Sequence, residues 1–107
     1  MKLLDLIIDK MEDLKAEDIK VYDFKNTSPI CDAFVVCEAQ SSRQVKAIAD
    51  AVEKAVLEAG YKIKQQGKAG EESWVIIDAI DVVAHVFSSE ERAHYDIDKL
   101  YKEFIRG

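Results

Sequence analysis

Two apolar segments separated by only two residues, Trp74 to Ala79 and Val82 to Phe87, constrain the fold more than any other feature of the chain. Both segments are rich in β-branched and aromatic residues, which favour strands. A connection as short as Ile80–Asp81 can join two paired strands only in the antiparallel sense. The two residues lack the Asn-Gly chemistry usual in tight turns. The pattern nevertheless predicts a β-hairpin.

The spacing of the other apolar residues predicts further helices and strands. Apolar positions three and four apart are typical of amphipathic helices, and short β-branched or aromatic runs are typical of strands. No repeat or linker interrupts the order, so we expect one α/β domain over residues 1–107, with a mixed sheet of four to five strands flanked by helices. The expected elements are a helix over 2–15, strands over 19–24 and 33–38, a helix that opens at 41–44 and ends at 60, a strand over 61–65, the hairpin, and a last helix that includes 97–104.

Local signals mark the ends of the second helix. Ser41 and Gln44 fit a capping box, in which the hydroxyl accepts from one backbone amide and the glutamine reaches back to another. Gly60 is placed to end the helix in a left-handed turn. The apolar run 33–38 has no polar alternation, which predicts a strand covered on both faces. Residues 61–65 alternate, as in an exposed or edge strand, and residues 67–73 are expected to form a polar loop.

The net charge of the chain indicates which class of binding partner to expect. The chain carries 15 basic and 21 acidic residues, a net charge of -6. Proteins that bind nucleic acid usually present a basic face, because neutralised phosphates supply much of the affinity. Little direct contact with nucleic acid is therefore expected. An acidic protein is better suited to a basic protein partner, since complementary charge speeds encounter.

Membrane and redox signals both favour the cytoplasm. No apolar run approaches the roughly 20 residues that span a bilayer. Acidic residues interrupt the N-terminal apolar segment, and no small-residue cleavage site follows it, which argues against a secretory signal. Cys31 and Cys37 lie six residues apart without a Cys-x-x-Cys motif. They are expected to be buried free thiols.

Asp78 and Asp81 raise the possibility of metal chemistry. Two acids near a strand end can hold Mg²⁺ for nucleotidyl transfer. Such sites need both carboxylates on one strand face, whereas residues three apart point to opposite faces. The Ser41–Ser42 pair also has no glycine beside it, so no phosphate loop is present. Turn-forming or partner-facing acids are the favoured interpretation, and we expect no metal or cofactor.

The two histidines offer little catalytic chemistry. His85 shares a strand face with Val83 and Phe87, where a lone histidine is usually a hydrogen-bonded structural residue. A general base needs a nucleophile or an acid beside it, and neither is found in the sequence near His85. His94 is expected at the surface. Neither histidine has metal-ligand spacing to a partner.

The hairpin instead offers candidate contact residues. If Val75 and Ile77 pack under helices, Trp74 and Ile76 are left partly exposed on the other face, as in an interface hot spot. The plainer interpretation, that Trp74 is half-buried beneath a helix, is equally open. Glu91 and Tyr95 lie one helical turn apart just after the hairpin. A solvated helix start is the plainer interpretation there.

Several motifs together resemble one known family. They are SSRQVKAIAD after DAFVV, the hairpin WVIIDAIDVVAHVF, and EERAHYDIDKLY. In this combination, over roughly residues 3–103, the chain is similar to the ribosomal silencing factor (Iojap-like) family. Ile80 stands where that family usually has glycine, Gln66 replaces a common glutamate, and Tyr101 replaces a frequent tryptophan. The hairpin turn is therefore expected to be wider or differently bent.

The resemblance implies a nucleotidyltransferase-like fold without its catalytic signature. Proteins of this family bind the large ribosomal subunit through a ribosomal protein on its subunit-joining face. The bound factor blocks the small subunit sterically and slows translation, notably when nutrients are limiting. The resemblance also implies a homodimer when the protein is free, and a link to maturation of the large subunit.

We therefore expect a translation repressor and not an enzyme. Its anticipated partner is the large ribosomal subunit, reached through a basic ribosomal protein. Two alternatives stay open: a large-subunit assembly factor and, less favoured, a minimal Mg-dependent nucleotidyltransferase. The residues expected to contact the partner are Trp74, Ile76, Asp78, Asp81, Glu91 and Tyr95.

Overall fold

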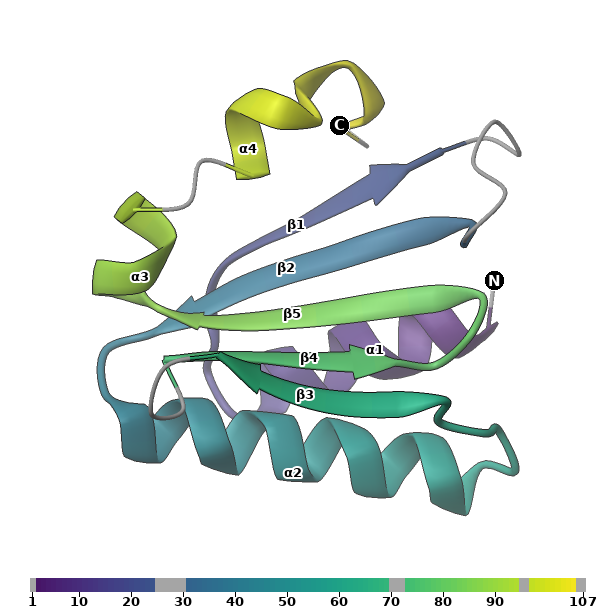
Figure 1. Cartoon of the computed structure of the whole chain (residues 1–107). Helices are drawn as coiled ribbons and strands as arrows, with labels where there is room; N and C mark the ends of the chain where they lie inside the picture. The colour runs from purple at the N-terminus through teal and green to yellow at the C-terminus, as the bar shows by residue number, and fades with distance from the viewer. Residues whose placement is uncertain (1, 25–30, 70–72, 95–96, 106–107) are drawn as a thin grey trace.

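A five-stranded mixed sheet organises the chain (Figure 1). The computed structural model describes residues 2–24, 31–69, 73–94 and 97–105, with the backbone alone for residues 65–69 and 98. The strand order is β1-β2-β5-β4-β3, and only β2 and β5 pair in parallel. This agrees with the expected mixed sheet. The strands are β1 (Glu17–Asp23), β2 (Ala33–Ala39), β3 (Gln65–Ala69), β4 (Trp74–Asp78) and β5 (Val82–Ser88).

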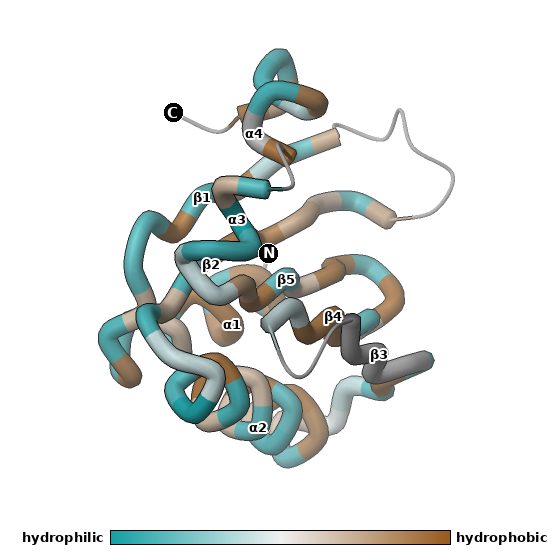
Figure 2. The backbone as a smooth tube through the Cα atoms, turned by 60° about the vertical axis from the view of Figure 1, so that its left-hand side comes forward, coloured by the Kyte–Doolittle hydropathy of each residue, from teal (hydrophilic) through white to brown (hydrophobic). Residues whose placement is uncertain are grey.

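Two helices cover one face of the sheet. They are α1 (Lys2–Asp13) and α2 (Ser42–Glu58), and Figure 2 shows them on one side of the sheet, with the C-terminal helices at the other. Each helix turns an apolar stripe inward, because its apolar residues recur every three or four positions. The helices bury Ile7 and Met11 from α1, and Ile48 and Val52 from α2, against alternate residues of the strands.

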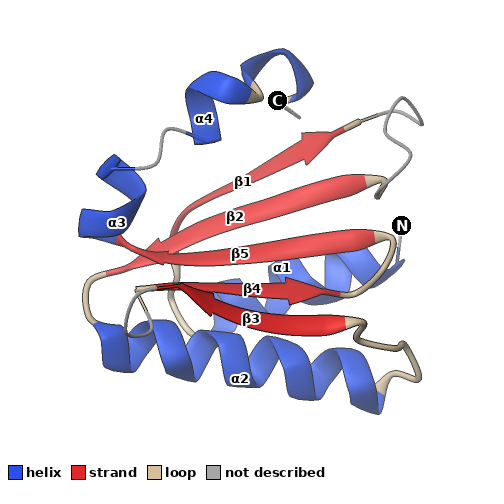
Figure 3. Cartoon of the chain, in the orientation of Figure 1, coloured by secondary structure: helices blue, strands red, loops and turns tan. Residues whose placement is uncertain are grey.

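The C-terminal segment covers part of the other face. It consists of α3 (Ser89–His94), α4 (Ile97–Leu100) and a 3-10 helix, η1 (Lys102–Phe104). Ile97, Tyr101 and Phe104 join the aromatic cluster formed by Tyr22, Phe24 and Phe34. In Figure 3, α4 lies beside β1, at the end of the sheet farthest from β3. The two faces of β2 are both packed, as its continuous apolar run predicted.

The helix caps follow the sequence signals with one difference. The Ser41 hydroxyl accepts from the Gln44 N–H at 3.2 Å, as expected. The Gln44 side chain reaches back to the N–H of Gln40 at 3.3 Å, one residue earlier than a capping box requires. Gly60 has φ +91°, and Tyr61 N–H donates to Val56 O at 3.1 Å, which completes the left-handed end of the helix.

The strand expected over 61–65 is wrong. Strand β3 covers Gln65–Ala69 instead, and residues 61–63 belong to no regular element. Tyr61 and Ile63 alternate because both pack against the core under the helices. Strand β3 pairs with β4 through backbone atoms at the sheet edge, and such pairing requires no apolar pattern. Part of the expected polar loop is therefore strand.

The last helix is also not continuous. The chain forms α3, then α4, then η1. The Ser88 hydroxyl accepts from Glu91 N–H at 3.1 Å, which caps the start of α3. Leu100, an apolar residue at the end of α4, is 69% exposed. A segment that wraps over a twisted sheet breaks its helix to bring Ile97, Tyr101 and Phe104 onto the aromatic cluster.

Candidate interaction surface

The predicted hairpin is confirmed. Strands β4 and β5 pair in antiparallel register from Trp74 opposite Phe87 to Asp78 opposite Val83. Strand alternation sends Val75 and Ile77 to the helical side, where both are fully buried. Trp74 and Ile76 therefore lie on the other side, and both stay partly exposed. We call the surface formed by Trp74 and Ile76 the β4 face.

Trp74 rests on the aromatic side chains of β5. Its indole stacks on Phe87, with ring centroids 4.8 Å apart and an interplanar angle of 22°. Its Nε1–H donates to Nδ1 of His85 at 3.2 Å. The indole therefore has a defined position and still keeps part of its surface in solvent. A large, amphipathic and partly exposed ring is the kind of side chain that anchors protein interfaces.

His85 is the hydrogen-bonded structural histidine that its pattern predicted. Only 6% of the residue is exposed, and burial lowers the pKa of its imidazole to about 4. The ring is neutral near pH 7, so Nδ1 accepts from the indole and the proton sits on Nε2. Among the described residues, no hydrogen-bond partner meets that Nε2 atom.

The hairpin turn is held by Asp78. Its Oδ1 accepts from Ile80 N–H at 2.9 Å, while Asp81 N–H donates to Ala79 O at 2.9 Å. The second bond closes a γ-turn around Ile80, whose φ is +74°. Asp81 O accepts from Asp32 N–H at 2.7 Å, which ties the turn to the start of β2. The turn-forming interpretation of Asp78 is supported.

Ile80→Gly is expected to raise the free energy of unfolding by about 1 kcal/mol, because a β-branched residue is strained at positive φ and glycine is not. The Ile80 side chain is 47% exposed, so little packing is lost. Thermal unfolding would measure the change. Ile80→Ala is the matched control, since it removes most of the side chain and keeps the strain. Equal melting temperatures for the two variants would contradict the strain argument.

The expected contact residues do not form one compact cluster. Asp78 and the exposed Asp81 lie at the turn, whereas Trp74 lies at the opposite end of β4, roughly 13 Å away at 3.3 Å per residue. Glu91 is half-buried near that second end and lines a small polar pocket with Ser73 and His94. Tyr95 lies outside the described residues. The acids thus flank the β4 face at both ends.

Arg92 was missed by sequence reasoning, which placed it in a solvated helix start. Its side chain is only 5% exposed. Nη1 donates to Asp18 O at 2.6 Å and to Glu38 Oε1 at 3.3 Å, and Nη2 lies 3.4 Å from Asp18 Oδ2. These partners lie 74 and 54 residues away in the chain. We call these contacts of Arg92 with Asp18 and Glu38 the Arg92 clasp. Because the partners are distant in the sequence, no local pattern predicts it.

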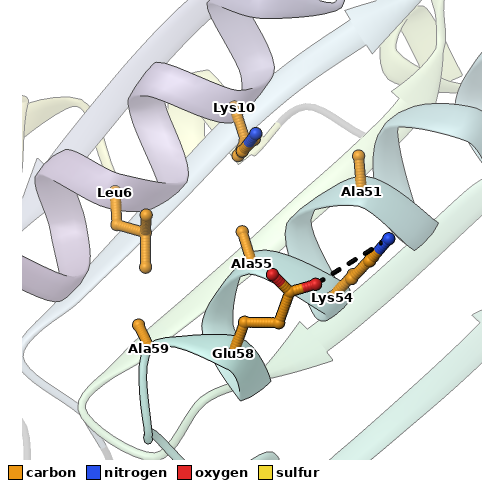
Figure 4. A pocket seen from close by; sticks show the side chains of 7 residues that line it. All are labelled: Leu6, Lys10, Ala51, Lys54, Ala55, Glu58 and Ala59. Atoms are coloured by element: carbon orange, nitrogen blue, oxygen red, sulfur yellow. Dashed lines mark ion pairs between the residues drawn. The ribbon is translucent and has the colours of Figure 1, made fainter.

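A separate groove lies between α1 and α2 (Figure 4). It contains Lys54 and Glu58, whose charged atoms lie 3.8 Å apart. The rest of its lining is mostly alanine, together with Leu6 and Lys10. The described residues contain no group of three His, Cys, Asp or Glu side chains arranged for a metal.

The cysteines are buried free thiols, as predicted. Burial raises the pKa of Cys37 to about 12, and it also raises the pKa of Cys31. Both side chains are thus held as thiols near pH 7. In the described part of the chain, no helix combines the length and the apolar character needed to cross a membrane.

A partly exposed aromatic side chain held in one position, as Trp74 is, is a feature common in protein interfaces. Comparison with known proteins makes this specific: the chain belongs to the family described as "ribosomal silencing factor during starvation", whose model matches residues 1–106. This confirms the resemblance seen in the sequence motifs. The matched range includes every residue of the β4 face and the turn.

Individual relatives agree with the family assignment. The ribosomal silencing factor RsfS of Halalkalibacterium halodurans is 40% identical, over 94% of this chain and 86% of the relative. RsfS of Bacillus subtilis is 38% identical, over 84% of this chain and 76% of the relative. An X-ray crystal structure of a Chromobacterium violaceum protein superposes with a TM-score of 0.89 at 35% identity, over 94% of this chain and 84% of that one.

Proposed function

We propose that this protein represses translation by binding the large ribosomal subunit through a basic ribosomal protein on the subunit-joining face. The bound protein then blocks the small subunit sterically. The observation that carries the proposal is Trp74, which is held by stacking and a hydrogen bond yet stays partly exposed beside Ile76. Membership of a family described as ribosomal silencing factors supports the ribosome as the binding target.

The charges around the β4 face support a basic partner. The chain has a net charge of -6, and Asp78, Asp81 and Glu91 flank the face at its two ends. Acidic groups at the edge of an apolar anchor raise the rate of encounter with a basic surface and set its orientation. The same charge balance disfavours direct contact with the phosphates of ribosomal RNA.

The dimensions of the molecule are sufficient for steric occlusion. Its principal extents are 33 × 33 × 22 Å. A standard interface covers roughly 800 Å² per partner, which is a patch of about 28 Å on a side. The hairpin and its flanking acids can supply such a patch. A body of this size at the joining face would keep the two subunits apart without any change of shape.

The proposal places the protein in the cytoplasm, where bacterial subunits meet. It also includes a homodimer for the free protein, which sedimentation equilibrium would detect as twice the monomer mass.

Sucrose-gradient sedimentation of purified bacterial subunits tests the function directly. The protein is expected to co-migrate with the large subunit, and the fraction of joined ribosomes is expected to fall as protein is added. If it remains at the top of the gradient and joining is unchanged, the proposal is wrong.

Trp74→Ala is expected to weaken binding to the large subunit by about 2 kcal/mol, roughly 30-fold, because truncating a central aromatic anchor removes most of its contact area. Titration of fluorescently labelled protein against large subunits would measure the change. Leu57→Ala is the matched control, since Leu57 is 50% exposed on α2, which covers the opposite face. Undiminished affinity in a folded Trp74→Ala variant would exclude Trp74 as the anchor.

A further inference from the structure

We propose that His85 is a positioning residue for docking, which holds the Trp74 indole in its binding orientation before the partner arrives. The inference rests on the proposed docking role of Trp74 and deepens it. It assigns a function to the buried histidine that the contact residues alone do not explain.

The imidazole of His85 lies between the rings of Trp74 and Phe34. On one side its Nδ1 accepts from Trp74 Nε1–H at 3.2 Å. On the other side its ring meets Phe34 edge-on, with centroids 4.7 Å apart. Phe34 in turn contacts Tyr101 of the C-terminal segment at 5.3 Å. The acceptor atom is therefore held between packed rings and cannot follow a moving indole.

The stability of the fold alone does not account for this histidine. With Nδ1 as the acceptor, the neutral ring carries its proton on Nε2. That N–H is buried and meets no partner among the described residues. An unsatisfied buried donor destabilises a fold, and native proteins keep few of them. A phenylalanine would fill a similar space without that cost, which indicates that the acceptor atom is what the site requires.

Fixing the indole in advance improves binding through entropy. A partly exposed tryptophan that nothing holds in place could occupy several rotamers, and a partner would have to select one of them. Immobilising one such side chain at the moment of binding weakens affinity by about tenfold at most. The hydrogen bond to His85, together with the Phe87 stack, removes that penalty before the encounter.

Two variants separate the acceptor from the ring. His85→Phe keeps an aromatic ring and removes the acceptor. His85→Asn loses the ring but keeps an acceptor, Oδ1, at about the position of Nδ1. Trp74 is the only tryptophan of the chain, so indole fluorescence and the indole N–H resonance report on it alone. The melting temperature and the affinity for the large subunit would also be measured for each full-length variant.

In His85→Phe we expect an upfield shift of the indole N–H resonance and an affinity about tenfold weaker than wild type. Its melting temperature should stay within about 5 °C of wild type, because the unsatisfied donor is lost together with the hydrogen bond. His85→Asn should recover part of the resonance position and part of the affinity. In a Trp74→Ala background, His85→Phe should weaken binding no further, because the two residues act through one contact.

The outcomes distinguish this inference from the proposed function. If Trp74→Ala weakens binding and His85→Phe does not, the positioning role fails and the docking role of Trp74 stands. If wild-type protein does not bind the large subunit, both fail. If His85→Phe weakens binding while the indole resonance is unchanged and the melting temperature falls, His85 is merely structural and the inference is overturned.

Discussion

Arg92→Ala is expected to lower the free energy of unfolding by about 3 kcal/mol, because removing one member of a buried ion pair leaves its partner charge unpaired. Glu38 has only 20% of its side chain exposed, so its carboxylate cannot recover full hydration. The carbonyl of Asp18 also loses a 2.6 Å charge-assisted bond. The Asp18 carboxylate contributes little, since that side chain is 52% exposed.

The clasp depends on a bulge in β1. Glu17 pairs with Glu38 and Lys20 pairs with Val36, so β1 carries one extra residue in this interval. Asp18 adopts φ +49°, a left-handed conformation that aspartate tolerates better than most residues. The bulge turns the Asp18 carbonyl toward Arg92, as bulges re-aim groups at sheet edges. Helix α3 has six residues and needs such an anchor to stay folded.

Chemical denaturation of Arg92→Ala, Arg92→Lys and Arg43→Ala would measure how much the clasp of Arg92 with Asp18 and Glu38 contributes to the free energy of unfolding. Arg43→Ala is the control, because Arg43 is exposed on α2 and its loss should change stability by less than about 0.5 kcal/mol. Arg92→Lys should fall between wild type and alanine, since an ammonium cannot reach two acceptors with the geometry of a guanidinium. Hydrogen exchange should show α3 opening first in Arg92→Ala. A loss below about 1 kcal/mol would contradict the buried clasp.

The sequence predicted the elements that arise from local patterns. The hairpin followed from two apolar runs and a two-residue connection, and the ends of α2 followed from Ser41 and Gly60. Each of these signals lies within one short stretch of the chain, where short-range geometry decides the structure. The alternation of Val75 and Ile77 against Trp74 left the buried side of β4 open, and the structure buries Val75 and Ile77.

The features that sequence reasoning missed depend on contacts between distant segments. Strand β3 exists because its backbone completes the edge of β4, so its polar residues gave no strand signal. The apolar spacing of the last segment suggested one helix, but the aromatic cluster formed by Tyr22 and Phe24 determines where that segment bends. Pairing of this kind is decided by tertiary packing, which overrides local propensity.

For the candidate surface, the residues alone indicated a docking protein and the family resemblance indicated the ribosome. Of the two interpretations left open for Trp74, the structure has the one in which Trp74 and Ile76 are partly exposed on one face. Asp78 proved to support the turn, while contact of the acids with a partner stays a prediction. The bond between Trp74 and His85 was not anticipated, although strand parity places both residues on the same side and adjacent strands bring them together.

Acidification is expected to destabilise the protein through His85 by about 3 kcal/mol between pH 7 and pH 4. In the unfolded chain the imidazole has its ordinary pKa of 6.5, whereas burial lowers that pKa to about 4 in the folded protein. Between these values the unfolded chain binds a proton that the folded protein does not. The free energy of unfolding therefore falls as the pH drops through 6.5, by about 1.4 kcal/mol per pH unit, and this contribution levels off below about pH 4.

The difference between wild type and His85→Phe isolates this contribution, because the carboxylates that titrate over part of the same range are common to both proteins. Urea unfolding at half-unit steps from pH 7 to pH 4 should show the wild-type curve falling away from that of the variant. His94→Gln is the matched control, since it removes the other histidine of the chain, which is exposed. Parallel wild-type and His85→Phe curves would mean that water reaches the imidazole in the folded state. The hydrogen bond from Trp74 Nε1–H to His85 Nδ1 would then be too exposed to hold the indole in place. His85 would neither cause the loss of stability in acid nor position Trp74.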